Sequence, residues 1–374
     1  MKYYIIAGEA SGDLHGSNLI KELRLLDAHA NIRCWGGDLM KAEGAVVIKH
    51  FRDLAFMGFV EVVLNIRTIL KNIRFCKSDI LSFQPDILIL IDYPGFNIRI
   101  AEWAKKEEIK TVYYISPQIW AWKESRVHTI KKCVDKMLVI LPFEKDFYSK
   151  WNYKVEYVGH PLVKVIEDFK KAHPRDLDKK KIIALLPGSR KQEINIKLPV
   201  MLQVSKAFPK YEFIVAKAPG LEDSFYQPFL SGYTNVLALG GQTYQLLNQA
   251  TAALVTSGTA TLEAALFGVP EVVCYKGNPI SYHIAKWVIK VKYISLVNLI
   301  MNKLVVKELI QADMTTANCI LELKELLDNP AKKQQLQLDY GNLKELLSKG
   351  GNASSNAAYI IFEFTRKHPA GYTY

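Results

Sequence analysis

A single aspartate at the end of a predicted buried strand is the first candidate for acid–base chemistry. Residues 87–91 read I-L-I-L-I, an all-apolar run typical of a parallel strand buried on both faces, and Asp92 follows directly. A carboxylate at such a strand end is partly desolvated, which raises its pKa and suits it to act as a general base. The alternative is an aspartate that caps the loop before Pro94.

The turn after the first strand carries further polar groups. Residues 3–8 predict a short strand, and a helical pattern follows from Gly16 to about Ala28. The turn between them, G-E-A-S-G-D, crowds Glu9, Ser11 and Asp13 together. Elsewhere His15 and His160 are rival bases, although isolated histidines are more often structural than catalytic.

Two strand-to-helix turns in the second half of the chain suit a phosphate group. The first is Pro187-Gly188-Ser189-Arg190, after the strand-like run 182–186. Backbone N–H groups and the helix dipole favour an anion at such a turn, and Arg190 adds a bidentate donor for a diphosphate. The alternative is a turn that needs glycine only for its conformation.

The second such turn begins at Ser257 and repeats this arrangement after another strand. Ser257, Gly258 and Thr259 place small and hydroxyl residues at the helix start, where they cap the helix or contact phosphate oxygens. Glu263 lies about one and a half turns into that helix, from where its carboxylate reaches a ribose diol. An ordinary capped helix with a surface glutamate is the alternative.

Several familiar nucleotide and metal motifs are missing from the sequence. It contains neither the full G-x-G-x-x-G of nicotinamide sites nor a P-loop, and no D-x-D dyad that would hold a metal beside a nucleotide-sugar. We therefore expect no metal and no cofactor. A diphosphate leaving group must then be stabilised by helix N-termini and by arginine.

The elements that position these loops alternate between strand and helix, which predicts two doubly wound parallel α/β sheets. We predict an N-terminal Rossmann-like domain over residues 1–165 and a C-terminal one over 178–349, facing each other across a cleft. Lysine-rich residues 170–181 predict an exposed linker, and a helix over 350–368 is expected to pack back on the first domain. Ligands of such sheets bind beyond the carboxyl ends of the strands, where the four loops above lie.

The length, the cysteine content and the net charge of the chain limit its domain number, its cellular compartment and its partners. The 374 residues suit two domains, and the five cysteines form no paired motif, so we expect neither disulfides nor zinc but a reducing cytoplasm. No apolar run approaches membrane-spanning length, and we expect no signal peptide. The net charge of +12 is compatible with nucleic acid, an anionic membrane surface, phosphorylated substrates or simply solvated lysines. Without interleaved basic and aromatic residues we expect no nucleic acid.

One segment predicts a membrane-surface helix. Between residues 59 and 77, an apolar stripe runs beside basic residues spaced for one helix face. The stripe and its basic neighbours comprise Phe59, Val62, Val63, Ile66, Arg67, Leu70, Lys71 and Arg74. Such a helix suits an anionic membrane surface and acyl chains, whereas the alternative is a core helix with a solvated basic edge. Residues 284–292, with Trp287 and three lysines, are a weaker second candidate.

These motifs, in this order, closely resemble the lipid-A-disaccharide synthase family. The resemblance runs from residue 4 to about residue 310 and rests on the combination of motifs, none of which is specific alone. The matching residues are 8–13 with Gly16, 57–62, 92–97, 114–122 with Arg126, 141–144, 158–161, 186–190, 257–260 with 262–263, and 293–296 with Asn298.

The resemblance implies an inverting glycosyltransferase of the GT-B fold. Its donor would be UDP-2,3-diacylglucosamine, its acceptor 2,3-diacylglucosamine 1-phosphate, and its products a β-1,6-linked disaccharide 1-phosphate and UDP. Asp92 would be the catalytic base, with Glu9, Ser11 and Asn298 as further active-site groups. Gly188, Ser189, Arg190, Ser257, Gly258, Thr259 and Glu263 would bind the donor. The setting would be the cytoplasmic face of the inner membrane of a Gram-negative bacterium.

Two positions depart from the family pattern. The family usually has D-x-P-D-F-N, whereas this chain has Gly95 at the second aspartate, which leaves Asp92 as the single carboxylate of the loop. Where the family has S-L-P-N, this chain has Val297 in place of the proline. We expect this difference to loosen the loop that carries Asn298. The alternatives are another UDP-sugar enzyme of this fold, a UDP-sugar epimerase, and a non-catalytic protein that binds nucleotide or docks on membranes. The oligomeric state does not follow from the sequence.

Overall fold

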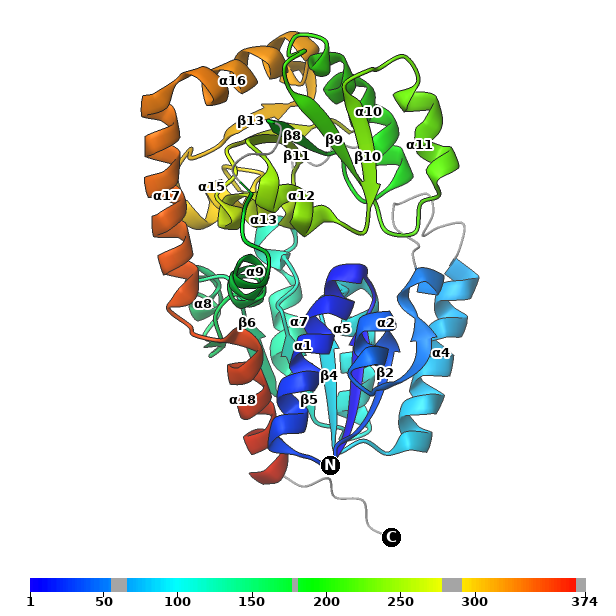
Figure 1. Cartoon of the computed structure of the whole chain (residues 1–374). Helices are drawn as coiled ribbons and strands as arrows, with labels where there is room; N and C mark the ends of the chain where they lie inside the picture. Colours follow the sequence, from blue (N-terminus) through cyan, green and yellow to red (C-terminus); the bar gives the residue numbers. More distant parts are fainter. Residues whose placement is uncertain (55–65, 177–180, 278–290, 368–374) are drawn as a thin grey trace. The chain divides into compact units, whose positions relative to one another are not determined.

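A computed structural model describes residues 1–54, 66–176, 181–277 and 291–367 (Figure 1). The chain divides into two compact units. Unit 1 comprises Met1–Pro161 with Lys349–Tyr374, and unit 2 comprises Leu162–Ser348. Each unit has its own parallel sheet covered by helices, so each buries its own core.

The sheet of unit 1 has seven parallel strands in the order β3-β2-β1-β4-β5-β6-β7. The strands are β1 (Lys2–Ala7), β2 (Asn31–Gly36), β3 (Val46–His50), β4 (Ile87–Ile91), β5 (Thr111–Tyr114), β6 (Lys136–Val139) and β7 (Glu156–Tyr157). Every residue of β4 is buried, as its apolar run predicts. The chain winds outward in one direction from β1 and in the other from β4, so the topological switch point lies between these two neighbours.

The helices of unit 1 cover both faces of this sheet. They are α1 (Ala10–Leu26), α2 (Asp38–Ala42), a 3₁₀ turn η1 (Phe51–Leu54), α4 (Ile66–Phe83), α5 (Pro94–Lys106), α6 (Ile119–Trp122), α7 (Arg126–Cys133), α8 (Glu144–Ser149) and α18 (Ala353–Lys367). Helix α18, red in Figure 1, packs along the blue α1 although it lies at the other end of the sequence.

Helix α1 begins at Ala10, earlier than the helical start near Gly16 that the sequence pattern predicts. Ser11 and Asp13 therefore lie in its first turns, and only Glu9, at the N-cap, belongs to the preceding turn. The pattern starts late because the first turn is polar and contains Gly12, so it shows no apolar periodicity. The Asp13 carboxylate accepts hydrogen bonds from the backbone N–H groups of Gly37 (2.7 Å) and Met40 (3.1 Å), which makes it a structural cap for α2.

The sheet of unit 2 has six parallel strands in the order β10-β9-β8-β11-β12-β13. They are β8 (Ile182–Leu186), β9 (Glu212–Lys217), β10 (Val236–Gly240), β11 (Ala252–Thr256), β12 (Glu271–Tyr275) and β13 (Lys307–Ile310). Strands β8 and β11 are entirely buried and pair directly, with Leu186 opposite Val255. The switch point of this second sheet lies between them.

The helices of unit 2 are α9 (Pro161–Ala172), α10 (Lys191–Ser205), α11 (Asp223–Leu230), α12 (Thr243–Gln249), α13 (Thr259–Phe267), α15 (Leu296–Met301), a 3₁₀ turn η2 (Gln311–Asp313), α16 (Thr316–Asp328) and α17 (Pro330–Ser348). The linker predicted from residue 170 begins later, because Lys170 and Lys171 form the last turn of α9. The apolar face of α9, with Leu162 and Ile166 buried, holds that helix against its unit. Residues 177–180 of the predicted linker lie outside the described residues.

Candidate functional site

The loops that follow β1 and β4 meet at the switch point of unit 1. Strands β1 and β4 end side by side, with Ala7 opposite Ile91. The Tyr93 ring lies against Gly8 so closely that a β-carbon at Gly8 would collide with the ring. Glycine is therefore required at residue 8 by close approach, and the two candidate loops of this unit are in direct contact.

Asp92 and Tyr93 form a strained turn. Both have positive φ angles, +43° and +49°, in the left-handed region that residues other than glycine seldom adopt. Two buried side chains hold the turn through the carbonyl oxygen of Asp92. The Asn97 amide donates to it at 2.8 Å and the Tyr113 hydroxyl at 2.5 Å. Strain of about 1–3 kcal/mol per residue persists only where surrounding contacts fix the conformation, which these hydrogen bonds do.

The environment of Asp92 raises the pKa of its carboxyl group to about 7. The main cause is burial, and the negative charge of Glu9 adds to it, against a hydrogen bond from the Tyr93 backbone that lowers the pKa. A carboxylate with this pKa accepts a proton near neutral pH much more readily than an ordinary aspartate. The geometry thus supports a general base at Asp92, with Glu9 as the group that tunes it. Ser11 is exposed in the first turn of α1.

The two rival histidines are buried and uncharged. Burial lowers the pKa of His15 to about 4, and burial together with His15 lowers that of His160 to about 3. Imidazoles with such pKa values are weak bases at neutral pH, so they suit proton abstraction less well than Asp92.

The two phosphate-type turns of unit 2 lie side by side, because they follow the paired strands β8 and β11. Gly188 and Gly258 adopt φ angles of +122° and +135°, a conformation that an L side chain rarely takes. Space is open in front of Gly258, where a β-carbon would meet nothing within 4 Å. Gly258 and Arg190 are the N-cap residues of α13 and α10, so the N-termini of both helices adjoin these turns.

Arg190 belongs to a row of alternating charges along α10. Its Nη1 lies 3.7 Å from Oε1 of Glu193, whose Oε2 lies 3.8 Å from Nζ of the buried Lys197. The Glu193 carboxylate also lies against Gly188, where a β-carbon would collide with it. Sequence reasoning missed Glu193 and Lys197, although the spacing of residues 190, 193 and 197 on one helix face could have indicated them.

The second turn is linked to its surroundings by side-chain hydrogen bonds. The Ser257 hydroxyl donates to the carbonyl oxygen of Ile294 at 2.7 Å. The Tyr244 hydroxyl donates to Glu263 at 3.2 Å, and burial raises the pKa of Glu263. A partly buried carboxylate held in this way is placed to accept hydrogen bonds, as a ribose diol would require. Thr259 and Ser189 are exposed at their turns.

Asn298 lies within α15, is fully buried, and has both atoms of its amide group held by hydrogen bonds. The amide nitrogen donates to Glu308 (2.9 Å) and to the Val306 carbonyl (2.8 Å), and the oxygen accepts from the backbones of Val305 and Val306. Glu308 in turn accepts from the backbones of Ile294 and Ser295. This network favours a positioning role for Asn298. The predicted role in contact with substrate stays a prediction.

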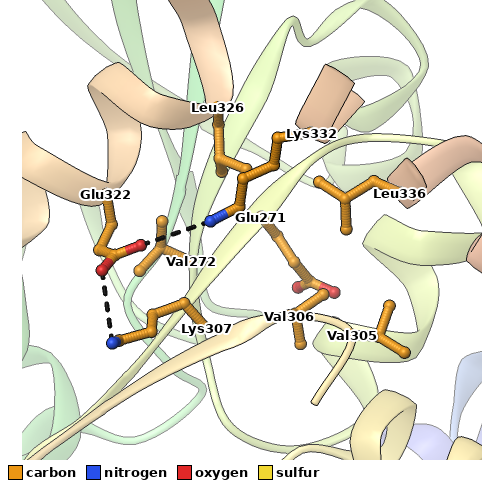
Figure 2. A pocket seen from close by; sticks show the side chains of 9 residues that line it. All are labelled: Glu271, Val272, Val305, Val306, Lys307, Glu322, Leu326, Lys332 and Leu336. Carbon is orange, nitrogen blue, oxygen red and sulfur yellow. Dashed lines mark ion pairs between the residues drawn. The ribbon is translucent and has the colours of Figure 1, made fainter. Parts of the chain in front are cut away.

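A separate small pocket, lined by charged and apolar side chains, lies at the amino ends of β12 and β13 (Figure 2). Glu322 pairs there with Lys307 at 3.4 Å and with Lys332 at 3.8 Å. The Glu271 carboxyl group has no hydrogen-bond partner among the described residues, and burial raises its pKa well above the usual range. This pocket is remote along the strands from the two phosphate-type turns and is not part of the candidate site.

No group of three or more His, Cys, Asp or Glu side chains in the described ranges is arranged to hold a metal ion. The five cysteines, all within those ranges, are buried free thiols. Unit 1 thus offers an acid–base turn at Asp92, and unit 2 offers two adjacent turns at helix N-termini that suit an anion.

Two doubly wound parallel sheets with such turns at their switch points define the GT-B class, which includes glycosyltransferases and UDP-sugar epimerases. Solved structures support this class. A UDP-GlcNAc 2-epimerase from Neisseria meningitidis has a TM-score of 0.65 and 16% identity, over 98% of this chain and 100% of that one. The calicheamicin glycosyltransferase CalG4 has a TM-score of 0.61 and 16% identity, over 98% and 99%. At this identity the likeness concerns the fold alone.

Sequence relatives identify the family. The family described as lipid-A-disaccharide synthetase matches residues 3–362. Lipid-A-disaccharide synthases of Geobacter metallireducens and Coxiella burnetii are each 38% identical to this chain, the first over 97% and the second over 96% of both chains. The chain belongs to the lipid-A-disaccharide synthetase family and is a glycosyltransferase.

Replacing the candidate base tests its role. Asp92→Asn removes the proton acceptor, so we expect turnover to fall by about 10²–10⁴-fold while UDP binds almost as in the wild type. Because Asp92 must be ionised to act and its pKa is about 7, kcat/KM of the wild type should fall as the pH drops below that value. Glu9→Gln removes a negative charge and should shift this fall to lower pH. Collapse of UDP affinity in Asp92→Asn would instead show a structural role.

A second substitution tests the diphosphate contact. Arg190→Ala should weaken UDP binding, measured by calorimetry, by about 10–100-fold, because a hydrogen bond to a charged group contributes about 1.5–3 kcal/mol. Lys191→Ala, at the adjacent exposed residue, is the control and should leave the affinity unchanged. Equal affinities for the two variants would contradict the role of Arg190.

Proposed function

We propose that this enzyme transfers 2,3-diacylglucosamine from its UDP derivative to 2,3-diacylglucosamine 1-phosphate. The products are the β-1,6-linked tetra-acylated disaccharide 1-phosphate and UDP, consistent with a glycosyltransferase that joins lipid A precursors. The observation that carries the proposal is the position of Asp92 directly after β4, in a turn fixed by Asn97 and Tyr113, in a chain that matches this family over residues 3–362. The two phosphate-type turns of unit 2 supply the complementary donor function.

In the proposed reaction, Asp92 removes the proton of the acceptor's 6-hydroxyl group while that oxygen attacks the anomeric carbon of the donor. The bond from this carbon to the UDP oxygen breaks on the opposite face, which inverts the configuration. Negative charge develops on the departing diphosphate. The N-termini of α10 and α13, together with Arg190, stabilise that charge. These groups make a metal unnecessary, so we propose a metal-independent reaction without a cofactor.

Helix α4 supports the proposal that the enzyme works at an anionic membrane surface. Its exposed side carries Ile66 and Leu70, 41% and 45% exposed, beside the exposed basic residues Arg67, Lys71 and Arg74. Ile73, Cys76 and Ile80 are buried in unit 1, and Ile66, seven residues before Ile73, continues the same apolar stripe into the exposed start of the helix. The start of α4 therefore exposes part of this stripe beside a basic face, a combination that suits a membrane surface. Phe59, Val62 and Val63 lie outside the described residues, as does most of the segment 284–292.

None of the described helices is both long and apolar enough to span a bilayer. Attachment at the surface of the inner membrane, through α4, is the mode that we propose. It would bring the enzyme to substrates whose acyl chains reside in the lipid phase.

The reaction is tested by mass spectrometry of the products formed from UDP-2,3-diacylglucosamine and 2,3-diacylglucosamine 1-phosphate. We expect the disaccharide 1-phosphate and one equivalent of UDP, without added metal and in the presence of EDTA. An epimerised UDP-sugar would indicate an epimerase, and consumption of neither substrate would indicate a binding protein. Failure to form disaccharide at high enzyme concentration would refute the proposal.

The membrane surface is tested by sedimentation with vesicles that contain anionic phospholipid. Replacing Arg67, Lys71 and Arg74 together with glutamine should reduce the bound fraction, because each basic residue near such a surface contributes about 1 kcal/mol. A charge-matched control replaces the exposed Lys206, Lys210 and Lys324 of unit 2. Equal sedimentation of the two triple variants would contradict the proposal and show that α4 is an ordinary packing helix with a solvated basic edge.

A further inference from the structure

A group of cationic side chains surrounds an exposed tryptophan in unit 1. Trp122, at the end of α6, is 47% exposed. The Arg126 guanidinium carbon lies 5.2 Å from the centre of its ring, and the Lys123 ammonium lies 5.9 Å from it. Arg99 of α5 is exposed and lies close enough to Arg126 for their charges to repel. Burial lowers the pKa of Arg126, and the charge of Arg99 lowers it further. We call these four residues the Trp122 cluster.

The Trp122 cluster lies on the same side of the sheet as the candidate base. Tyr113 lies between the two. Its hydroxyl donates a hydrogen bond to the Asp92 carbonyl oxygen, and its pKa is affected by the charges of both Asp92 and Arg126. Helix α5, which carries Arg99, begins two residues after Asp92 and packs against α7, which begins at Arg126. The cluster thus flanks the carboxyl ends of β4 and β5.

The two arginines of this cluster have no carboxylate partner among the described residues. The charges that act on Arg126 are those of Tyr113 and Arg99. Holding two guanidinium groups near one another without a counter-charge costs free energy, which a bound anion would recover. Two arginines and a lysine suit a phosphate monoester, since guanidinium groups bind phosphate oxygens in bidentate geometry.

We infer that the Trp122 cluster is the subsite for the phosphate of the acceptor. Arg126 and Arg99 bind the phosphate monoester of the sugar 1-phosphate, Lys123 adds a third positive charge, and the Trp122 ring provides an apolar surface for the pyranose. This inference rests on the proposed function, because it assigns the phosphate of that acceptor. It also separates the two phosphate-bearing substrates, since the donor diphosphate has its turns in unit 2 and the acceptor phosphate its cations in unit 1.

The subsite is tested by comparing two acceptors, 2,3-diacylglucosamine 1-phosphate and the same lipid without phosphate, at saturating UDP-diacylglucosamine. The wild type should prefer the phosphorylated acceptor by at least tenfold in kcat/KM. Arg126→Ala should reduce this preference at least tenfold, through the KM of the phosphorylated acceptor, while the phosphate-free acceptor and UDP affinity stay unchanged. Arg99→Ala should act in the same direction, and Arg126→Lys should retain part of the preference.

The control is Lys132→Ala, which removes an exposed positive charge from the same helix α7 and should leave the preference unchanged. An unchanged preference for the phosphorylated acceptor in both arginine variants would overturn the inference. Equal losses of kcat/KM with both acceptors would also overturn it, because they would show a structural role. Calorimetric binding of glucosamine 1-phosphate provides an independent readout. If the wild type makes no disaccharide from either acceptor, the proposed function fails. Weaker binding of glucosamine 1-phosphate by Arg126→Ala would still support the anion subsite, and equal binding would overturn it.

Discussion

Two pairs of neighbouring parallel strands, β1 with β4 and β8 with β11, decide where chemistry can take place in this protein. At each pair the strand order reverses, so the helices that follow the two strands pack on opposite faces of the sheet and leave polar backbone groups of the loops between them accessible. The strands themselves are buried and apolar, and they supply no reactive group. Every candidate group that acts on substrate is therefore carried by a loop or by the first turns of the following helix.

The turn at Asp92 shows how the sheet determines the properties of one carboxyl group. The backbone of Asp92 and Tyr93 is held in an unfavourable conformation by hydrogen bonds from Asn97 and Tyr113. The same burial that makes these hydrogen bonds strong also removes water from the Asp92 carboxylate. Strain, orientation and the burial that raises the proton affinity thus arise from one arrangement of side chains, to which Glu9 adds its charge from the neighbouring loop.

The buried strands could be predicted from the sequence because long apolar runs leave little ambiguity. Residues 87–91 and 182–186 became β4 and β8 with the predicted bounds. Strands β2 and β13 were not predicted, since polar residues interrupt N-I-R-C-W-G and K-E-L-I and hide the run. The start of α1 was predicted too late for a related reason, as its first turn is polar.

The candidate site was partly visible in the sequence. Asp92, Glu9 and the two glycine turns could be named because strand ends mark the ligand side of a parallel sheet. The charges that accompany Arg190 could also have been found from their spacing on one helix face, whereas the tuning of Asp92 by Glu9 and the hydrogen bonds of Asn298 could not be named. Each depends on which side chains meet after folding, and Asn298 bonds to Glu308 across a turn whose path the sequence does not specify.

The carboxylate of Glu193 has a consequence for turnover. It lies against Gly188 and pairs with Arg190, so this turn contains an anion of the protein's own. In the proposed reaction, a diphosphate bound by Arg190 competes with Glu193 for the guanidinium group, and the ion pair that is lost offsets part of the electrostatic attraction. The same competition would favour the departure of UDP, so some affinity for the donor would be exchanged for easier release of the product.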